Sequence, residues 1–286
     1  MIECGSPEAL AATVRLLRDA HAGSILLVEG GADAKCYRAF TVEGQCELLC
    51  AGSRDVLIRA LEILQGASVE GVLGIVDADF SLIDNDMPGL RSLFHTDSHD
   101  LETMVVASPA LERVLAELGS AAKLEAHARL AHQTHREAVI AAALPIGHLR
   151  HLSRSADLGL RFEGLRFSTF ILNKPCLSCD TNRLVSEVKN HSQRHDLNSA
   201  AIVSELSART ASGHDPWQIC CGHDLANILA VALRRVFGTN PAATVSPERV
   251  EQSLRLAFEF AYFRETQLYS AVWEWQRSTG QPVFRS

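Results

Sequence analysis

Three short acidic motifs in the N-terminal part of the chain could bind metal. They read Glu29-Gly-Gly-Ala-Asp33, Asp77-Ala-Asp79 and Asp100-Leu-Glu102. Hard divalent cations such as Mg²⁺ prefer carboxylate oxygens as protein ligands and usually keep several water molecules. Crowded carboxylates repel one another unless a cation is present. The motifs therefore predict a site for one or two Mg²⁺ or Mn²⁺ ions.

Each motif alone also has a structural explanation. Acidic residues that follow a strand often cap the next helix, as Asp77 and Asp79 would do. Asp100 could likewise be an N-cap, and Glu102 an early helical residue favoured by the helix dipole. Three such motifs at the ends of successive elements favour a metal site over three unrelated caps.

The apolar pattern indicates which elements hold these motifs. Residues 24–29 and 71–77 are short apolar runs that end in a carboxylate, as is typical of strands buried on both faces. Helices predicted at 32–40 and 53–64 alternate with these strands and with a strand at 47–50. This alternation predicts an α/β fold with a parallel sheet and right-handed crossovers. Because sites in such sheets form outside the carboxyl ends of the strands, Glu29 and Asp77 are expected at one edge.

The rest of the chain is predicted to be mainly helical. Helical spacing covers 109–144, 182–190, 197–207, 223–237 and 246–277, and residues 161–172 suggest one or two strands that could complete the core. We therefore expect a catalytic core at 1–107 and a helical extension at 108–286.

Composition limits the classes of protein. The net charge of −7 disfavours a large sequence-independent grip on nucleic acid, although bound metal ions would reverse the sign locally and a basic partner could supply the grip. There is no apolar run of roughly 20 residues and no secretory signal, so a cytoplasmic protein without membrane contact is expected. Eight cysteines without such a signal indicate reduced thiols.

Four strings carry a family resemblance: Leu27-Val-Glu-Gly30, Gly74-Ile-Val-Asp-Ala-Asp-Phe80, Thr96-Asp-Ser-His-Asp-Leu-Glu102 and Cys221-Gly-His-Asp-Leu225. They resemble the TOPRIM domain of the overcoming-lysogenization-defect nucleases, and more specifically the stand-alone TOPRIM-like proteins of unknown function. Relatives of these serve as effectors beside an ATPase in bacterial anti-phage systems of the PARIS type. The resemblance is specific over about residues 24–105 and loose beyond, and it implies a Rossmann-like TOPRIM core.

The resemblance also implies a role for each acidic residue. Glu29 would be a metal ligand and a general base, with Asp33 as a second ligand beside it. Asp77 and Asp79 would hold Mg²⁺, and the third motif, Asp100 with Glu102, would complete a second metal position. Two metal ions would stabilise the attacking water and the leaving oxygen of a phosphodiester displacement.

In the nuclease family a lysine follows the last acidic motif. Lys174 is the candidate for that catalytic lysine here, with Lys189 as the alternative. We thus expect a magnesium-dependent endonuclease that cleaves DNA or RNA, transfer RNA included, in anti-phage defence. An ABC-type ATPase partner and a homo-oligomeric state are part of this expectation.

Two other functions stay open. A non-catalytic regulatory or assembly subunit could bind metal at the same acidic site. A phosphatase of the haloacid-dehalogenase kind is suggested by Asp77-Ala-Asp79-Phe80, but there the Asp-x-Asp motif follows the first strand, whereas here it follows the third.

Several residues in the second half are further candidates. His223 and Asp224 begin an apolar helix, and they either cap it or orient a substrate phosphate at its N-terminus. Arg161, in a group of arginines, could contact substrate phosphates. Cys176, Cys179, Cys220 and Cys221 with His214 or His223 offer enough ligands for zinc, but without the spacing of a known zinc module, so buried thiols are expected.

Overall fold

The computed structural model describes residues 5–173, 176–211 and 213–286. The chain forms two compact units. The first, here called the sheet unit, contains the described residues up to Ser81 together with Asn85–Leu101 and Glu259–Ser286. The second, the helical unit, contains Leu82–Asp84 and Glu102–Phe258.

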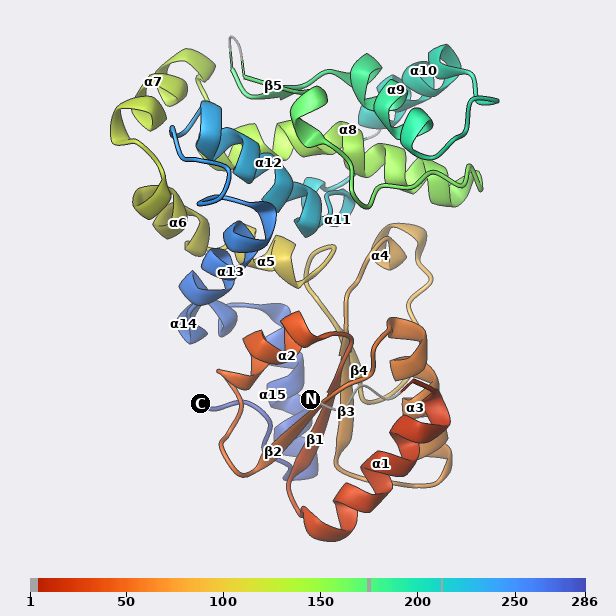
Figure 1. The fold of residues 1–286 in the computed structure, drawn as a ribbon. Coiled ribbons are helices and arrows are strands. Elements are labelled where there is room, and N and C mark those ends of the chain that lie inside the picture. The colour runs from red at the N-terminus through yellow and green to blue at the C-terminus, as the bar shows by residue number, and fades with distance from the viewer. Residues whose placement is uncertain (1–4, 174–175, 212) are drawn as a thin grey trace. The chain divides into compact units, whose positions relative to one another are not determined.

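A four-stranded parallel sheet is the centre of the sheet unit (Figure 1). Its strands are β1 (Ser24–Val28), β2 (Cys46–Cys50), β3 (Val72–Val76) and β4 (Leu93–His95), in the order β2-β1-β3-β4. Every residue of β1 and β3 is buried, as their continuous apolar runs predict. The expected α/β fold with a parallel sheet is confirmed.

Helices α1 (Pro7–Ala20) and α3 (Arg54–Gly66) pack against each other and against the sheet. Side chains of Leu10 and Val14 from α1 meet Leu57 and Leu61 from α3 in one core cluster with strand residues. Ser6 and Ser53 cap the two helices, each accepting a hydrogen bond from a first-turn N–H. Helices α2 (Gly31–Arg38) and α4 (Ser81–Asp84) follow β1 and β3.

The C-terminal segment belongs to the sheet unit, not to a helical extension, so the division differs from the one expected at residue 107. It contains α14 (Phe260–Phe263) and α15 (Gln267–Thr279). The carboxylate of Asp97 accepts hydrogen bonds of 2.7 Å from the N–H groups of Gln267 and Leu268, where α15 begins. Tyr37 of α2 packs edge-on against Phe263. These contacts join segments that are distant in the sequence.

The helical unit contains α6 (Ala110–Leu118), α7 (Ala121–Ala131), α8 (His135–Ser155), α9 (Thr181–His191), α10 (Ser199–Thr210), α11 (Pro216–Ile219), α12 (Gly222–Arg235) and α13 (Pro247–Ala257). Helix α5 (Leu101–Ala107) begins at the last residue of the sheet unit's second segment. Among the described residues, no helix is both long and apolar enough to cross a membrane.

The strands expected near residues 161–172 do not extend the parallel sheet. A short 3-10 helix (Phe167–Thr169) is followed by β5 (Ile171–Leu172), which pairs antiparallel with β6 (Ser178–Cys179). This two-stranded sheet lies in the helical unit. Two aromatic residues of this segment, Phe167 and Phe170, pack against each other with ring centroids 5.2 Å apart.

Candidate functional site

Glu29 and Asp77 lie at the point where the strand order of the sheet reverses. Glu29 directly follows β1 and Asp77 directly follows β3. These strands are neighbours, with Val28 opposite Ile75. The chain continues from β1 to β2 at one edge of the sheet and from β3 to β4 at the other edge. Open parallel sheets bind ligands in the crevice outside the carboxyl ends of the strands at such a switch point.

A direct hydrogen bond connects the two positions. The backbone N–H of Asp77 donates to Oε1 of Glu29 at 2.8 Å. Burial is the main cause that raises the pKa of Glu29 to about 7, and the charges of Asp79 and Asp33 act in the same direction. The hydrogen bond from the Asp77 N–H and the charge of Arg54 oppose the shift. A carboxylate that titrates near neutral pH can accept a proton in a reaction at that pH.

Asp33 closes the turn between β1 and α2. Its Oδ2 accepts a hydrogen bond of 2.8 Å from the N–H of Gly30, and its charge acts on Glu29. The first sequence motif therefore does place its two carboxylates close enough to repel each other.

Asp79 is held in an unusual backbone conformation. Its φ is +48°, in the left-handed region that L residues other than asparagine and aspartate seldom adopt. The N–H of Asp79 donates to the carbonyl of His99 at 2.6 Å, which fixes this turn after β3.

Arg54 is a site residue that our sequence analysis missed. It begins α3 after β2, and its Nη1 donates to the carbonyl of Asp77 at 2.5 Å and to Oδ2 of Asp79 at 3.1 Å. Its Nη2 donates to Oγ of Ser81 at 2.9 Å. A signal was present, because Arg54 follows a predicted parallel strand and so belongs to the same sheet edge.

His99 is the second missed residue. Its Nε2 lies 4.0 Å from Oδ1 of Asp79, and its ring packs edge-on against Phe80 with the centroids 4.7 Å apart. The loop that carries it is fixed by Thr96, whose hydroxyl accepts from the N–H of Ala78 at 2.9 Å. His99 stands directly before Asp100 in the third motif, which was the available signal.

The third motif is divided between the two units. Asp77 Oδ1 accepts a hydrogen bond of 3.1 Å from the N–H of Leu101 at the start of α5, and the carbonyl of Asp100 accepts from the Ser98 hydroxyl at 3.3 Å. Glu102 belongs to the helical unit, where it forms an ion pair of 3.5 Å with Arg255. The expected metal-binding roles of Asp100 and Glu102 stay predictions.

The remaining carboxylates are of the type that a hard divalent cation prefers, but among the described residues no three of them have oxygen atoms within 4.8 Å of one another. Glu29, Asp33, Asp77 and Asp79 offer oxygen donors from the ends of two neighbouring strands and the turns that follow them. The charges of Asp79 and Asp33 both raise the pKa of Glu29, and the charge of Arg54 lowers it. Oxygen donors of this kind suit Mg²⁺ better than a soft metal, and side-chain movement would have to bring them together around an ion.

Only one of the two lysine candidates lies among the described residues. Lys174 lies outside the described residues. Lys189 lies in α9 of the helical unit, where its Nζ donates to Oγ of Ser199 at 2.8 Å and to the carbonyl of Leu197. These two bonds give Lys189 a structural role inside the helical unit.

The other candidates also lie in the helical unit. Both carboxylate oxygens of Asp224 accept from Arg150, at 2.7 and 2.8 Å, and Nδ1 of His223 lies 2.7 Å from Oε1 of Glu251. Neither is the N-cap of α12, which is Cys221. Arg161 is exposed, and its backbone N–H donates to the Ser192 hydroxyl at 2.7 Å.

The set of zinc ligands considered from the sequence does not assemble among the residues that the structure describes. In the described part of the chain, Cys176, Cys179 and Cys220 do not gather with His214 or His223 into a group that could hold a metal. Burial raises the pKa of the Cys179 thiol to about 12, so without a bound metal ion this side chain is a neutral thiol at neutral pH.

Comparison with known proteins adds no family to this description. No model of a known protein family matches the chain, and no curated protein was found to match it.

Proposed function

We propose that the sheet unit is a TOPRIM-like core that binds Mg²⁺ and hydrolyses phosphodiester bonds of nucleic acid. The observation that carries the proposal is the direct bond between Glu29 and the residue after β3, Asp77, at the switch point of a parallel sheet. A single capping role explains Asp77 through its bond to Leu101, but it does not explain why Glu29, Asp33 and Asp79 gather beside it.

Each residue has a distinct task in this proposal. Asp77, Asp79 and Glu29 would hold Mg²⁺, which when bound supplies electrophilic stabilisation of the phosphate oxygens. Glu29, with its pKa near 7, is also suited to take a proton from the attacking water. Arg54 orients Asp79 through the 3.1 Å ion pair and fixes the turn through the carbonyl of Asp77.

The biological setting is proposed on the family resemblance. In it the nuclease is an effector in anti-phage defence beside an ABC-type ATPase, with DNA or RNA as substrate. The net charge of −7 supports a partner-dependent mode of action, because phosphate contacts need more basic surface than this chain offers.

One observation favours a second function, a non-catalytic regulatory subunit. Arg54 already forms an ion pair with Asp79, one of the predicted Mg²⁺ ligands, so part of the acidic charge is balanced without metal. The haloacid-dehalogenase alternative has less support, because the Asp-x-Asp motif follows β3, the third strand along the chain.

The test is cleavage of plasmid DNA, single-stranded DNA and total RNA with Mg²⁺ or Mn²⁺. Wild type is compared with Glu29→Ala and Asp77→Ala, and with Glu62→Ala as a control that removes an exposed carboxylate from α3 of the same unit. We expect metal-dependent cleavage by wild type and by the control, and loss of at least about 100-fold in both site variants.

A matched binding measurement separates the two functions. Calorimetric titration of Mg²⁺ into wild type and Asp77→Ala reports metal binding without any substrate. Binding without cleavage, even beside a co-expressed ATPase partner, would support the regulatory subunit. The absence of both would refute the metal site itself.

A further inference from the structure

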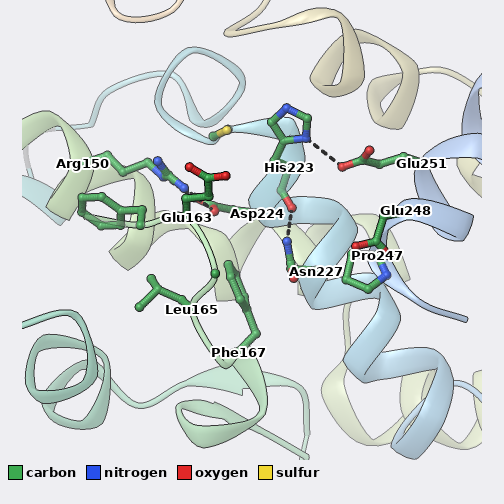
Figure 2. A pocket seen from close by; sticks show the side chains of 13 residues that line it. Arg150, Glu163, Leu165, Phe167, His223, Asp224, Asn227, Pro247, Glu248 and Glu251 are labelled. Atoms are coloured by element: carbon green, nitrogen blue, oxygen red, sulfur yellow. Dashed lines mark hydrogen bonds and ion pairs between the residues drawn. The ribbon is translucent and has the colours of Figure 1, made fainter. Parts of the chain in front are cut away.

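A pocket in the helical unit has the size of a small-molecule site. It has a volume of about 520 Å³, within the usual range of roughly 300 to 1,000 Å³ for ligand pockets. Its walls come from α8, the loop at 162–167, the first turns of α12 and the start of α13 (Figure 2). All of these belong to one compact unit.

One wall of the pocket is a neutral ion pair. Arg150 donates two hydrogen bonds to Asp224, whose side chain is only 2% exposed. The guanidinium also stacks over the ring of Phe162, 4.4 Å from its centroid. Because Asp224 cancels the charge of Arg150 and lies in the first turn of α12, neither the arginine nor the helix N-terminus is free to attract an anion.

The remaining charges of the lining are mostly negative. Glu163 lies on the side of Arg150, while Glu248 and Glu251 lie on the opposite side (Figure 2). A hydrogen bond from the Ser246 hydroxyl lowers the pKa of Glu248, so this carboxylate stays charged at neutral pH. His223, hydrogen-bonded to Glu251, can balance at most one of the three charges. The pocket is thus negative in either protonation state of His223.

The rest of the lining is apolar. Leu165 and Phe167 lie below the carboxylates, and the ring of Pro247 lies beside Glu248 (Figure 2). Leu165 and Phe167 are largely buried, at 8% and 5% exposure, so they form a fixed wall. A ligand that contacts both the acidic side chains and the apolar wall needs a positive group next to an apolar body. Carboxylates bind cations, and apolar walls bind apolar surface.

We propose that this pocket binds a small organic cation, an amine or guanidinium carried on an apolar or aromatic body. The cationic group is attracted by the carboxylates of Glu163 and Glu251 on the two sides of the pocket, and the body packs against Leu165 and Phe167. This ligand site goes beyond the nuclease activity and does not depend on it. It also replaces the phosphate-orienting role considered for His223 and Asp224.

Three indoles that differ in the charge of one end group test whether the pocket prefers a cation. Tryptamine, tryptophol and indole-3-acetate carry the same ring with a positive, neutral or negative end, and agmatine provides a guanidinium on an aliphatic chain. Each is titrated calorimetrically into the full chain. We expect tryptamine to bind at least about fivefold more tightly than tryptophol, and indole-3-acetate to bind most weakly. Equal binding of the indoles, tighter binding of the acid, or no saturable binding of tryptamine or agmatine at millimolar concentration would overturn the proposal.

Variants locate the binding in this pocket. Glu163→Gln and Glu251→Gln should each weaken tryptamine binding about fivefold and leave tryptophol binding unchanged. Glu117→Gln, an exposed residue of α6 outside the pocket, is the charge-matched control and should bind like wild type. Glu163 is exposed in a loop, so its variant tests the proposal even if Glu251→Gln unfolds. An equal loss in the control, or no loss in Glu163→Gln, contradicts the assignment.

Discussion

The N–H of Asp77 donates a 2.8 Å hydrogen bond to the Glu29 carboxylate, although the two residues are 48 positions apart. The bond exists because each residue directly follows one of two neighbouring parallel strands, β1 and β3. The pKa of Glu29 is still raised to about 7, mainly because the side chain is buried, with smaller contributions from the charges of Asp79 and Asp33. Glu29 is therefore the residue whose ionisation most directly reports on the acidic cluster.

Glu29→Gln should stabilise the metal-free protein at pH 8. The pKa of Glu29 rises from 4.5 in the unfolded chain to about 7 in the folded protein, so the folded protein holds this proton more tightly. That stabilisation is complete below about pH 4.5 and is lost as the pH rises through 7. Glutamine does not ionise, so the free energy of unfolding of the variant should exceed that of wild type by about 1 to 3 kcal/mol at pH 8.

Urea unfolding in EDTA at pH 4.5 and pH 8 measures this difference. Glu62→Gln, which removes an exposed carboxylate, should differ from wild type in stability by the same small amount at both pH values. A Glu29→Gln variant that is less stable than wild type by the same amount at both pH values would show that Glu29 is not the titrating group.

The sheet and its acidic edge could be predicted because their signals are local. The apolar runs of β1 and β3 are continuous and end in Glu29 and Asp77, and parallel topology then places both at one edge. Arg54 and His99 were missed because a single polar residue after a strand has no periodicity to distinguish it. Their positions after a predicted strand and beside Asp100 were weak signals, and the contacts to Asp79 in the structure are what distinguish them.

The return of the C-terminal segment to the sheet unit was not predictable for a different reason. The pattern of α15 shows that it is amphipathic but not what it packs against. Its position depends on Asp97, which accepts from the first N–H groups of that helix across 170 positions of sequence. Long-range capping of this kind leaves no trace in local spacing.

Arg54→Met should weaken the fold and strengthen the response to Mg²⁺. The variant loses hydrogen bonds to the carbonyl of Asp77, to Asp79 and to Ser81, and a loss of about 1 to 3 kcal/mol is expected in EDTA. Without the competing guanidinium, Mg²⁺ should raise the melting temperature more than it does in wild type. Thermal unfolding with and without Mg²⁺ measures both effects.

The control is Arg59→Met, which removes an exposed arginine from the same helix. It should leave both the stability and the Mg²⁺ response close to those of wild type. If Arg54→Met responds to Mg²⁺ less than wild type does, Arg54 supports the metal site more than it competes for it.

Breaking the ion pair between Arg150 and Asp224 should destabilise the helical unit strongly. Asp224→Leu leaves the arginine without its two hydrogen-bond acceptors, and Arg150→Met leaves a carboxylate that is 2% exposed without a counter-charge. Each change should cost about 3 kcal/mol, and the double variant should cost less than the sum. A double-mutant cycle by urea unfolding measures this coupling, and strictly additive losses would show that the two side chains do not stabilise each other.

His148 should make the protein sensitive to mild acid. Burial, with smaller contributions from His214, His151 and Arg209, lowers its pKa from 6.5 to about 4. The folded protein therefore disfavours the protonated ring, and stability falls as the pH drops from 6.5 toward 4. His148→Gln should lose less stability than wild type between pH 7 and pH 4.5. The control is His195→Gln, which changes an exposed histidine. Equal loss of stability in acid for wild type and both variants would show that His148 does not cause the acid sensitivity.

Gly147→Ala should destabilise the helical unit, although alanine is the better helix former. Gly147 lies within α8, and a β-carbon at this position would collide with the carbonyl oxygen of Ile219 in α11 and lie 2.9 Å from its carbonyl carbon. Both atoms belong to backbone, so neither can rotate away. Alanine gains up to about 1 kcal/mol of helix propensity, while overpacking of this kind costs about 1 to 3 kcal/mol, and a net loss is expected.

The matched control is Gly66→Ala at the end of α3, where an added β-carbon meets nothing within 4 Å. Its stability should equal or exceed that of wild type, because alanine also reduces the entropy of the unfolded chain. Urea midpoints of the two variants therefore separate propensity from packing. A Gly147→Ala variant as stable as Gly66→Ala would mean that α8 and α11 can move apart at no measurable cost, and that their close approach does not require glycine.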